Sequence, residues 1–163
     1  MAKTYEPIAT QTLGSSAASV TFSSISGAYT DLLLITSNGS TTATNTYVRL
    51  NGDSGSNYSF TQLTGTGSSA ISGRSSNQTA IRVDNYASAA TSITNAYIFQ
   101  LQNYSNTTTY KTVLTRTNEA GTGVDATVGL WRNTAAITSI LYYPGVGNWI
   151  TGSTFTLYGI KAA

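Results

Sequence analysis

The tetrapeptide Gly52-Asp53-Ser54-Gly55 carries the letters that surround the nucleophilic serine of chymotrypsin-like proteases. In that chemistry a histidine takes the proton of the serine and returns it to the leaving group. The chain contains no histidine. A lysine could replace it, and the candidates are Lys3, Lys111 and Lys161. Because the base is missing, we interpret the stretch as a turn, in which Gly accepts positive φ and Asp and Asn bond the local backbone.

The sequence offers few residues for other kinds of chemistry as well. Asn51, Asp53 and Asn57 offer oxygen ligands, but Ca²⁺ usually takes about 6–8 oxygens including several carboxylates, and this loop has one. No local motif pairs two acids for glycoside hydrolysis; the acids are Glu6, Asp31, Asp53, Asp84, Glu119 and Asp125. Phosphate-loop, dinucleotide and histidine-metal motifs are missing too. We therefore predict no catalytic residues, no cofactor, no metal and no enzymatic activity.

Composition indicates a folded chain with few charges. Charged residues make up 9% of the 163 residues, against about 25% in an average protein. Ser and Thr supply about three residues in ten, yet 11 Tyr, 4 Phe and 2 Trp are too many aromatics for a disordered chain. The net charge of +2 comes from scattered residues, so we predict no nucleic-acid partner. No apolar run reaches the ~18 residues of a membrane span, and cysteine is absent.

Alternation of polar and apolar residues predicts strands and no convincing helix. About ten segments alternate or form short apolar runs: 19–23, 29–36, 47–50, 58–63, 80–83, 96–102, 110–116, 126–131, 139–143 and 154–160. Residues 64–77 are Gly, Ser and Thr with few apolar residues, which predicts a long loop. The fold class is therefore all-β, an antiparallel β-sandwich and specifically a jelly roll.

The sequence predicts one β-sandwich domain over residues 8–163, preceded by an extended N-terminal arm over residues 1–7. The arm could be free or could lie across a neighbouring subunit. Trp131 ends an alternating run and is expected in the core or at an interface. Trp149 lies in a predicted loop, where burial and exposure are both open, and an exposed Trp would mark a binding surface. The candidate partner-binding residues are Tyr5, Pro7 and Trp149.

Several segments resemble one group of tailed-bacteriophage virion proteins in the same order along the chain. They are YEPIATQTLGSSAASVTFSSISGAYTDLLLI at the start, RLNGDSGSNYSFTQL, NYSNTTTYKT, LWRNTAAITSI and GSTFTLYGIKA at the end. The group is similar in an N-G-D-x-G-x-N-Y stretch, a W-R-[ST]-x-A-A-I segment and a closing G-S-x-F-x-L-Y-G-I. Each motif alone is short and built from common β-loop residues.

The resemblance implies a non-enzymatic structural component of a phage particle. Such modules occur as small capsid proteins or at the ends of tail fibre and baseplate proteins. We expect a capsid decoration (cement) protein, made in the host cytoplasm, that binds the major capsid protein on the outer capsid surface and forms a homotrimer. The alternative is a receptor- or carbohydrate-binding module of a tail fibre or baseplate. Weak contacts repeated over many copies would suit the first role.

Overall fold

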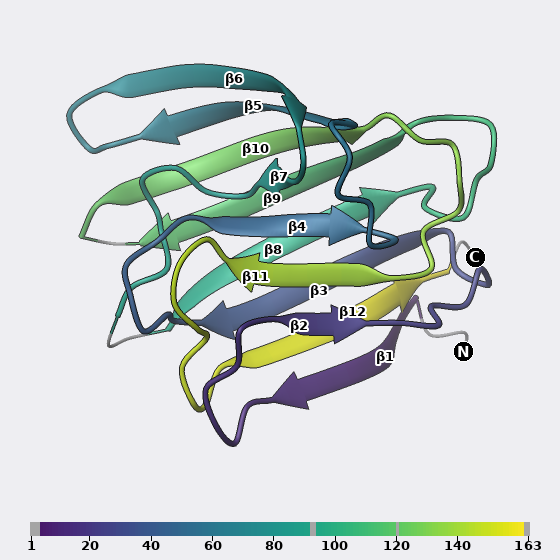
Figure 1. Ribbon diagram of the computed structural model, residues 1–163, viewed down its shortest axis with the longest axis horizontal. Helices are drawn as coiled ribbons and strands as arrows, with labels where there is room; N and C mark the ends of the chain where they lie inside the picture. Colours follow the sequence, from purple (N-terminus) through teal and green to yellow (C-terminus); the bar gives the residue numbers. More distant parts are fainter. Residues whose placement is uncertain (1–3, 92–93, 120, 162–163) are drawn as a thin grey trace.

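The computed structural model describes residues 4–91, 94–119 and 121–161, which form twelve strands and contain no helix (Figure 1). The larger sheet has the strand order β1-β12-β3-β8-β9-β10-β5-β6. Its strands are β1 (Tyr5–Thr12), β12 (Thr154–Ile160), β3 (Asp31–Asn38), β8 (Asn95–Gln102), β9 (Lys111–Glu119), β10 (Gly123–Trp131), β5 (Tyr58–Gly65) and β6 (Ala70–Gln78). The smaller sheet has the order β2-β11-β4-β7, with β2 (Val20–Phe22), β11 (Ile140–Pro144), β4 (Thr46–Leu50) and β7 (Ile81–Arg82).

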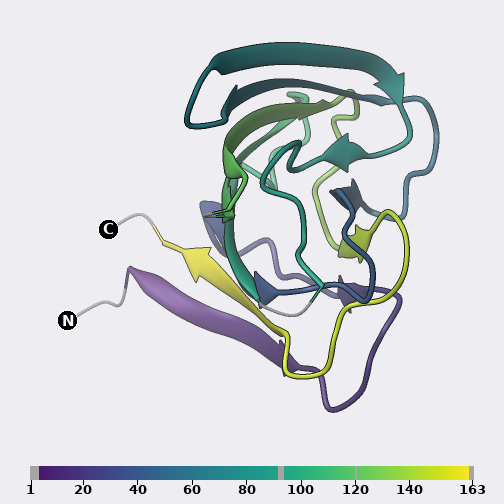
Figure 2. The same ribbon diagram turned by 90° about the vertical axis from the view of Figure 1, so that its left-hand side faces the viewer.

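The two sheets lie face to face as two layers, and the larger sheet curves around the smaller one (Figure 2). All strand pairs are antiparallel. The predicted all-β antiparallel sandwich is therefore confirmed, whereas the jelly-roll topology stays a prediction. Among the described residues, nothing helical is long and apolar enough to cross a membrane.

The core lies between the sheets and is richest in aromatic side chains near β11 and β12. Tyr142 stacks on Trp149 with ring centroids 4.8 Å apart, and Phe99 meets Tyr142 edge-on at 5.0 Å. The indole of Trp149 donates a hydrogen bond to the carbonyl of Tyr142. Trp149 is thus fully buried, because its loop folds back onto the core through backbone contacts with Ala17 and Ser40.

Two segments differ from the sequence prediction. The predicted loop over residues 64–77 contains most of β6, which pairs with β5 as an edge strand. Nearly all of β6 is exposed, so its residues needed no apolar alternation and gave no strand pattern. The predicted arm is also partly in the sheet, since Tyr5 and Pro7 belong to β1 and pair with Ile160 and Tyr158 of β12. Residues 1–3 lie outside the described residues.

A polar cluster occupies the sandwich interior where β5, β9 and β10 face the segment 83–87. The Asp125 carboxylate accepts hydrogen bonds from the backbone N–H groups of Asn85 (2.7 Å), Tyr86 (2.9 Å) and Ala87 (2.8 Å), and another from the Thr64 hydroxyl. The neighbouring Asp84 accepts from Asn45 and from Thr46, the first residue of β4 in the smaller sheet. Both acids are buried, and their bonds hold the segment 83–87 between the sheets.

Candidate functional site

The Gly-Asp-Ser-Gly stretch is a turn whose anchor is Asp53. Its carboxylate accepts hydrogen bonds from Gly55 N (2.8 Å), Asn57 Nδ2 (2.9 Å) and Trp131 Nε1 (2.7 Å). Asn51 and Gly52 before it have φ of 53° and 67°, the left-handed conformation that Asn and Gly accept most easily. Ser54 is exposed on this loop. The hydrogen bond from Trp131 is the largest cause that lowers the pKa of Asp53 below its usual range, against a smaller opposing effect of burial.

The turn also binds the segment that follows β10. Asn51 Oδ1 accepts from Thr138 N (2.8 Å) and Ser139 N (3.1 Å), and Asn51 Nδ2 donates to the carbonyl of Ala136 (2.8 Å). Arg132 N donates to the carbonyl of Asn57 at 2.9 Å. The Asn51–Asn57 turn and the segment 132–139 are therefore one structural unit.

Replacing Trp131 by phenylalanine should lower the free energy of unfolding by about 1.5 kcal/mol, since it removes a hydrogen bond to a charged acceptor. A lowered carboxylate pKa contributes stability above the unfolded pKa, and this is lost as pH falls through the folded pKa. The acid loss of stability below about pH 4 should therefore be smaller in Trp131→Phe than in the natural protein. Denaturant unfolding between neutral and acid pH measures both effects.

The chain offers a matched control in its second tryptophan. The Trp149 indole donates to a neutral carbonyl, so Trp149→Phe should lower stability by an amount that does not depend on pH. Equal acid slopes in the two variants would contradict the role given to Asp53.

The other predicted chemical groups are engaged in structure. Lys111 Nζ donates to the carbonyls of Thr109 (2.7 Å) and Thr134 (2.9 Å), and burial lowers its pKa. Lys161 pairs with Glu6 at 3.1 Å. Among the described residues, no three acids come together as a possible metal site.

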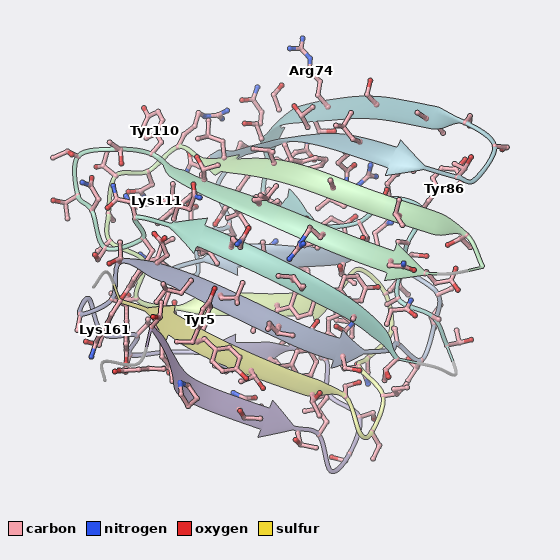
Figure 3. The ribbon with its side chains drawn as sticks, turned by 180° about the vertical axis from the view of Figure 1, so that it is seen from behind. Tyr5, Arg74, Tyr86, Tyr110, Lys111 and Lys161 are labelled. Carbon is pink, nitrogen blue, oxygen red and sulfur yellow. The ribbon has the colours of Figure 1, made fainter. Side chains whose placement is uncertain are left out.

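The most unusual surface is the side of the larger sheet that faces away from the smaller sheet, which we call the outer face. Figure 3 views this face and shows it uncovered from β1 to β6. On β10 the alternation is inverted, because Asp125 and Thr127 point inward and are buried while Val124 and Val128 are about half exposed. On the neighbouring β5, Leu63 is 63% exposed while Gln62 is buried.

The outer face is hollowed on both sides of Arg116. One hollow of about 730 Å³ is lined mainly by β5, β6 and β10, including Leu63, Ala70 and Val124. A second of about 390 Å³ lies over β3, β8 and β12, with Ile35 and Tyr158 in its wall. Arg116 lines both, so a cation sits between two hollows of an uneven surface that mixes exposed apolar and polar side chains, of the kind that protein partners cover.

Of the three candidate partner-binding residues, the structure places two on the surface and one in the core. Tyr5 is 55% exposed and lines the second hollow, and its ring lies over the outer face (Figure 3). Pro7 is exposed on the same strand. Trp149 is buried in the core and so presents no surface of the folded chain. Sequence reasoning missed Leu63, Val124 and Val128, although the apolar positions that alternate with Gln62, Asp125 and Thr127 were a visible signal.

A smaller candidate surface lies on the opposite side, on the smaller sheet. Tyr47 and Tyr143 are cross-strand partners whose rings stack at 5.7 Å, and the Arg49 guanidinium lies 5.2 Å from the Tyr143 ring centre. A hollow of about 240 Å³ beside them includes Gln78 and Thr79. Partly exposed aromatic rings next to amide and hydroxyl groups can stack on a sugar and bond its hydroxyls.

The chain was also compared with known proteins. A scan against protein-family models finds no family that matches. A search among curated proteins finds no similar sequence.

Proposed function

We propose that the protein is a non-enzymatic structural component of a bacteriophage particle, which decorates the outer capsid surface by docking on the major capsid protein through its outer face. The observation that carries the proposal is the inverted alternation on β5 and β10. Apolar side chains that point away from the protein's own core have a reason to be there if another protein covers them. The segments that resemble phage virion proteins support a location of the protein on the phage particle.

The outer face suits attachment by many weak contacts. Val128 and Leu63 are a little over half exposed, so covering each contributes about 1–2 kcal/mol, and Arg116 lies among them to pair with an acid of the partner. A trimer would place three such faces on one lattice site. Linked copies bind far more tightly than one copy, because later contacts form at high effective concentration.

Val128→Asp should reduce binding to particles assembled without the protein by at least about 30-fold, because it places a charge in an apolar contact. Co-sedimentation with capsids measures the occupancy, and circular dichroism checks that the sandwich is intact. Thr21→Asp is the matched control, since Thr21 is exposed on β2 of the other sheet and should leave occupancy unchanged. Full occupancy with Val128→Asp, or an electron-microscopy map that finds the protein only on the tail, would overturn the proposal.

A second candidate is a carbohydrate-binding tip of a tail fibre or baseplate, and the stacked Tyr47–Tyr143 pair favours it. Tyr143→Ala should abolish glycan binding and slow adsorption to the host under this function. A glycan array without hits, together with unchanged adsorption of the variant, would rule it out.

A further inference from the structure

β6 leaves a long free edge at one side of the larger sheet. It is the last strand of the sheet, pairs with β5 on one side, and has no described strand on the other. In an antiparallel pair about half of the N–H and C=O groups of an edge strand point outward. Figures 1 and 3 show the strand along the rim of the molecule, with Arg74 projecting from it.

The other three sheet edges carry features that hinder strand addition. β1 contains Pro7 and an irregular register between Pro7 and Ala9. β2 has 3 residues and β7 has 2. Proline, bulges and short length are the means by which proteins protect exposed edges. β6 has 9 residues and no proline, and its own register irregularity lies near its end, between Ser75 and Gln78. The part of β6 up to Ser75 is therefore the edge that remains open to pairing.

The side chains around β6 specify what kind of strand fits. Arg74 and Arg132 line a hollow of about 380 Å³ beside the middle and end of β6, and Arg132 is held there by Ser56 O and Asn77 Oδ1. The beginning of β6, at Ala70, borders the apolar hollow that includes Leu63. An added strand therefore meets positive charge opposite its centre and apolar surface towards one end.

A second copy of this chain fits the edge poorly. Arg74 is the middle residue of β6 (Ala70–Gln78), so two β6 strands paired over their full length about a two-fold axis would place one Arg74 against the other. Like charges directly opposite each other in a sheet are destabilising. The charge favours a strand that carries an acid.

We propose that β6 accepts an extended, proline-free segment of a different protein as a ninth, antiparallel strand of the larger sheet, with an acidic residue opposite Arg74. Main-chain hydrogen bonds supply affinity, and the acid together with apolar residues near Ala70 supplies specificity. The two hollows beside β6 lie on the rim of the outer face, since Leu63 and Val128 line them, but strand addition to the free edge does not depend on the capsid role.

The test is a titration of the isotope-labelled full chain with a capped nine-residue peptide. The peptide consists of Thr, with one central Glu and two Val near its C-terminus. Antiparallel pairing should shift the β6 amide signals first and slow their hydrogen exchange by at least about tenfold. A peptide with Lys in place of Glu should bind about fivefold more weakly. A peptide with alternate amides N-methylated should cause no shift.

The variant Arg74→Glu provides the matched control, because it should reverse the preference and bind the Lys peptide more tightly. Shifts confined to β1, or to strands of the larger sheet other than β5 and β6, would overturn the proposal. So would equal binding of the N-methylated peptide, an unreversed preference in Arg74→Glu, or a dimer in sedimentation that Arg74→Glu abolishes. Val128 lines the hollow beside Arg74, so the peptide titration uses the natural chain and Arg74→Glu and leaves Val128→Asp to the capsid assay. Failure of peptide binding and failure of capsid docking are then read out separately.

Discussion

Replacing Asp125 by alanine is expected to lower the free energy of unfolding by about 4 kcal/mol, because it leaves several buried donors without an acceptor. Asp125 accepts from three consecutive backbone N–H groups, those of Asn85, Tyr86 and Ala87, and from the Thr64 hydroxyl. The three amides belong to the segment that follows β7. In the variant these amides must find water or remain unpaired, so the segment should also exchange its amide hydrogens faster.

Two variants separate the loss of these bonds from other effects. Asp125→Asn keeps one carbonyl oxygen and the shape of the side chain, so it should cost less than Asp125→Ala. Val124→Thr changes the adjacent outward position on β10 and should shift stability by no more than about 0.5 kcal/mol. Denaturant unfolding with an unchanged m-value measures all three. A loss below about 1 kcal/mol in Asp125→Ala would show that water replaces the carboxylate easily.

The strands with a regular alternation were predictable from the sequence, as β8 and β12 show. Tyr97, Phe99 and Leu101 of β8 alternate with less buried neighbours, which is the pattern of a strand with one covered face. β6 was not predictable in this way, because a strand exposed on both faces is under no demand to alternate. The pairing that makes it a strand comes from β5, and alternation along one segment does not report pairing partners.

The candidate surface was harder to predict than the fold. In β10 the apolar positions Val124 and Val128 satisfy the strand pattern whichever face they occupy, and the sequence pattern alone favours burying them. The structure buries Asp125 and Thr127 instead, because the segment 83–87 brings polar backbone groups inside the sandwich: the Asp125 carboxylate accepts from its amides, and the Thr127 hydroxyl donates to the carbonyl of Val83. Trp149 is the opposite case, an aromatic ring in a loop that is nevertheless buried. The Gly-rich loop folds back and buries it.

The second acid of the interior predicts a pH-dependent stability. Asp84 Oδ1 accepts from Thr46 N (2.9 Å) and Asn45 Nδ2 (3.1 Å), and Oδ2 accepts from Thr46 Oγ1 (2.8 Å). Burial raises the pKa of Asp84 to about 7, against the opposing effect of these hydrogen bonds and with a smaller contribution from Asp125. Burial also raises the pKa values of the neighbouring Tyr97 and Tyr142, which therefore stay protonated across the neutral range.

Asp84→Asn should remove a decline in stability between about pH 4 and pH 7, which in the natural protein amounts to at most roughly 4 kcal/mol. The folded chain holds a proton on Asp84 at pH values where the unfolded chain, with an aspartate pKa of about 3.9, has released it. Unfolding therefore releases this proton, and the stability present at low pH is lost as pH rises through the folded pKa. Asparagine keeps an acceptor for Thr46 N but carries no charge. Denaturant unfolding at pH 8 should then show that the variant is more stable than the natural protein.

The direction of this slope distinguishes Asp84 from Asp53. Asp53 has a lowered pKa, so its contribution to stability disappears only below about pH 4. The raised pKa of Asp84 instead causes a loss of stability that grows as pH rises above that value. The natural protein should thus be most stable in mildly acid solution, and Asp84→Asn should move that maximum towards neutral pH. A variant with the same slope as the natural protein above about pH 4 would show that Thr46 and Asn45 stabilise the ionised carboxylate enough to offset its burial.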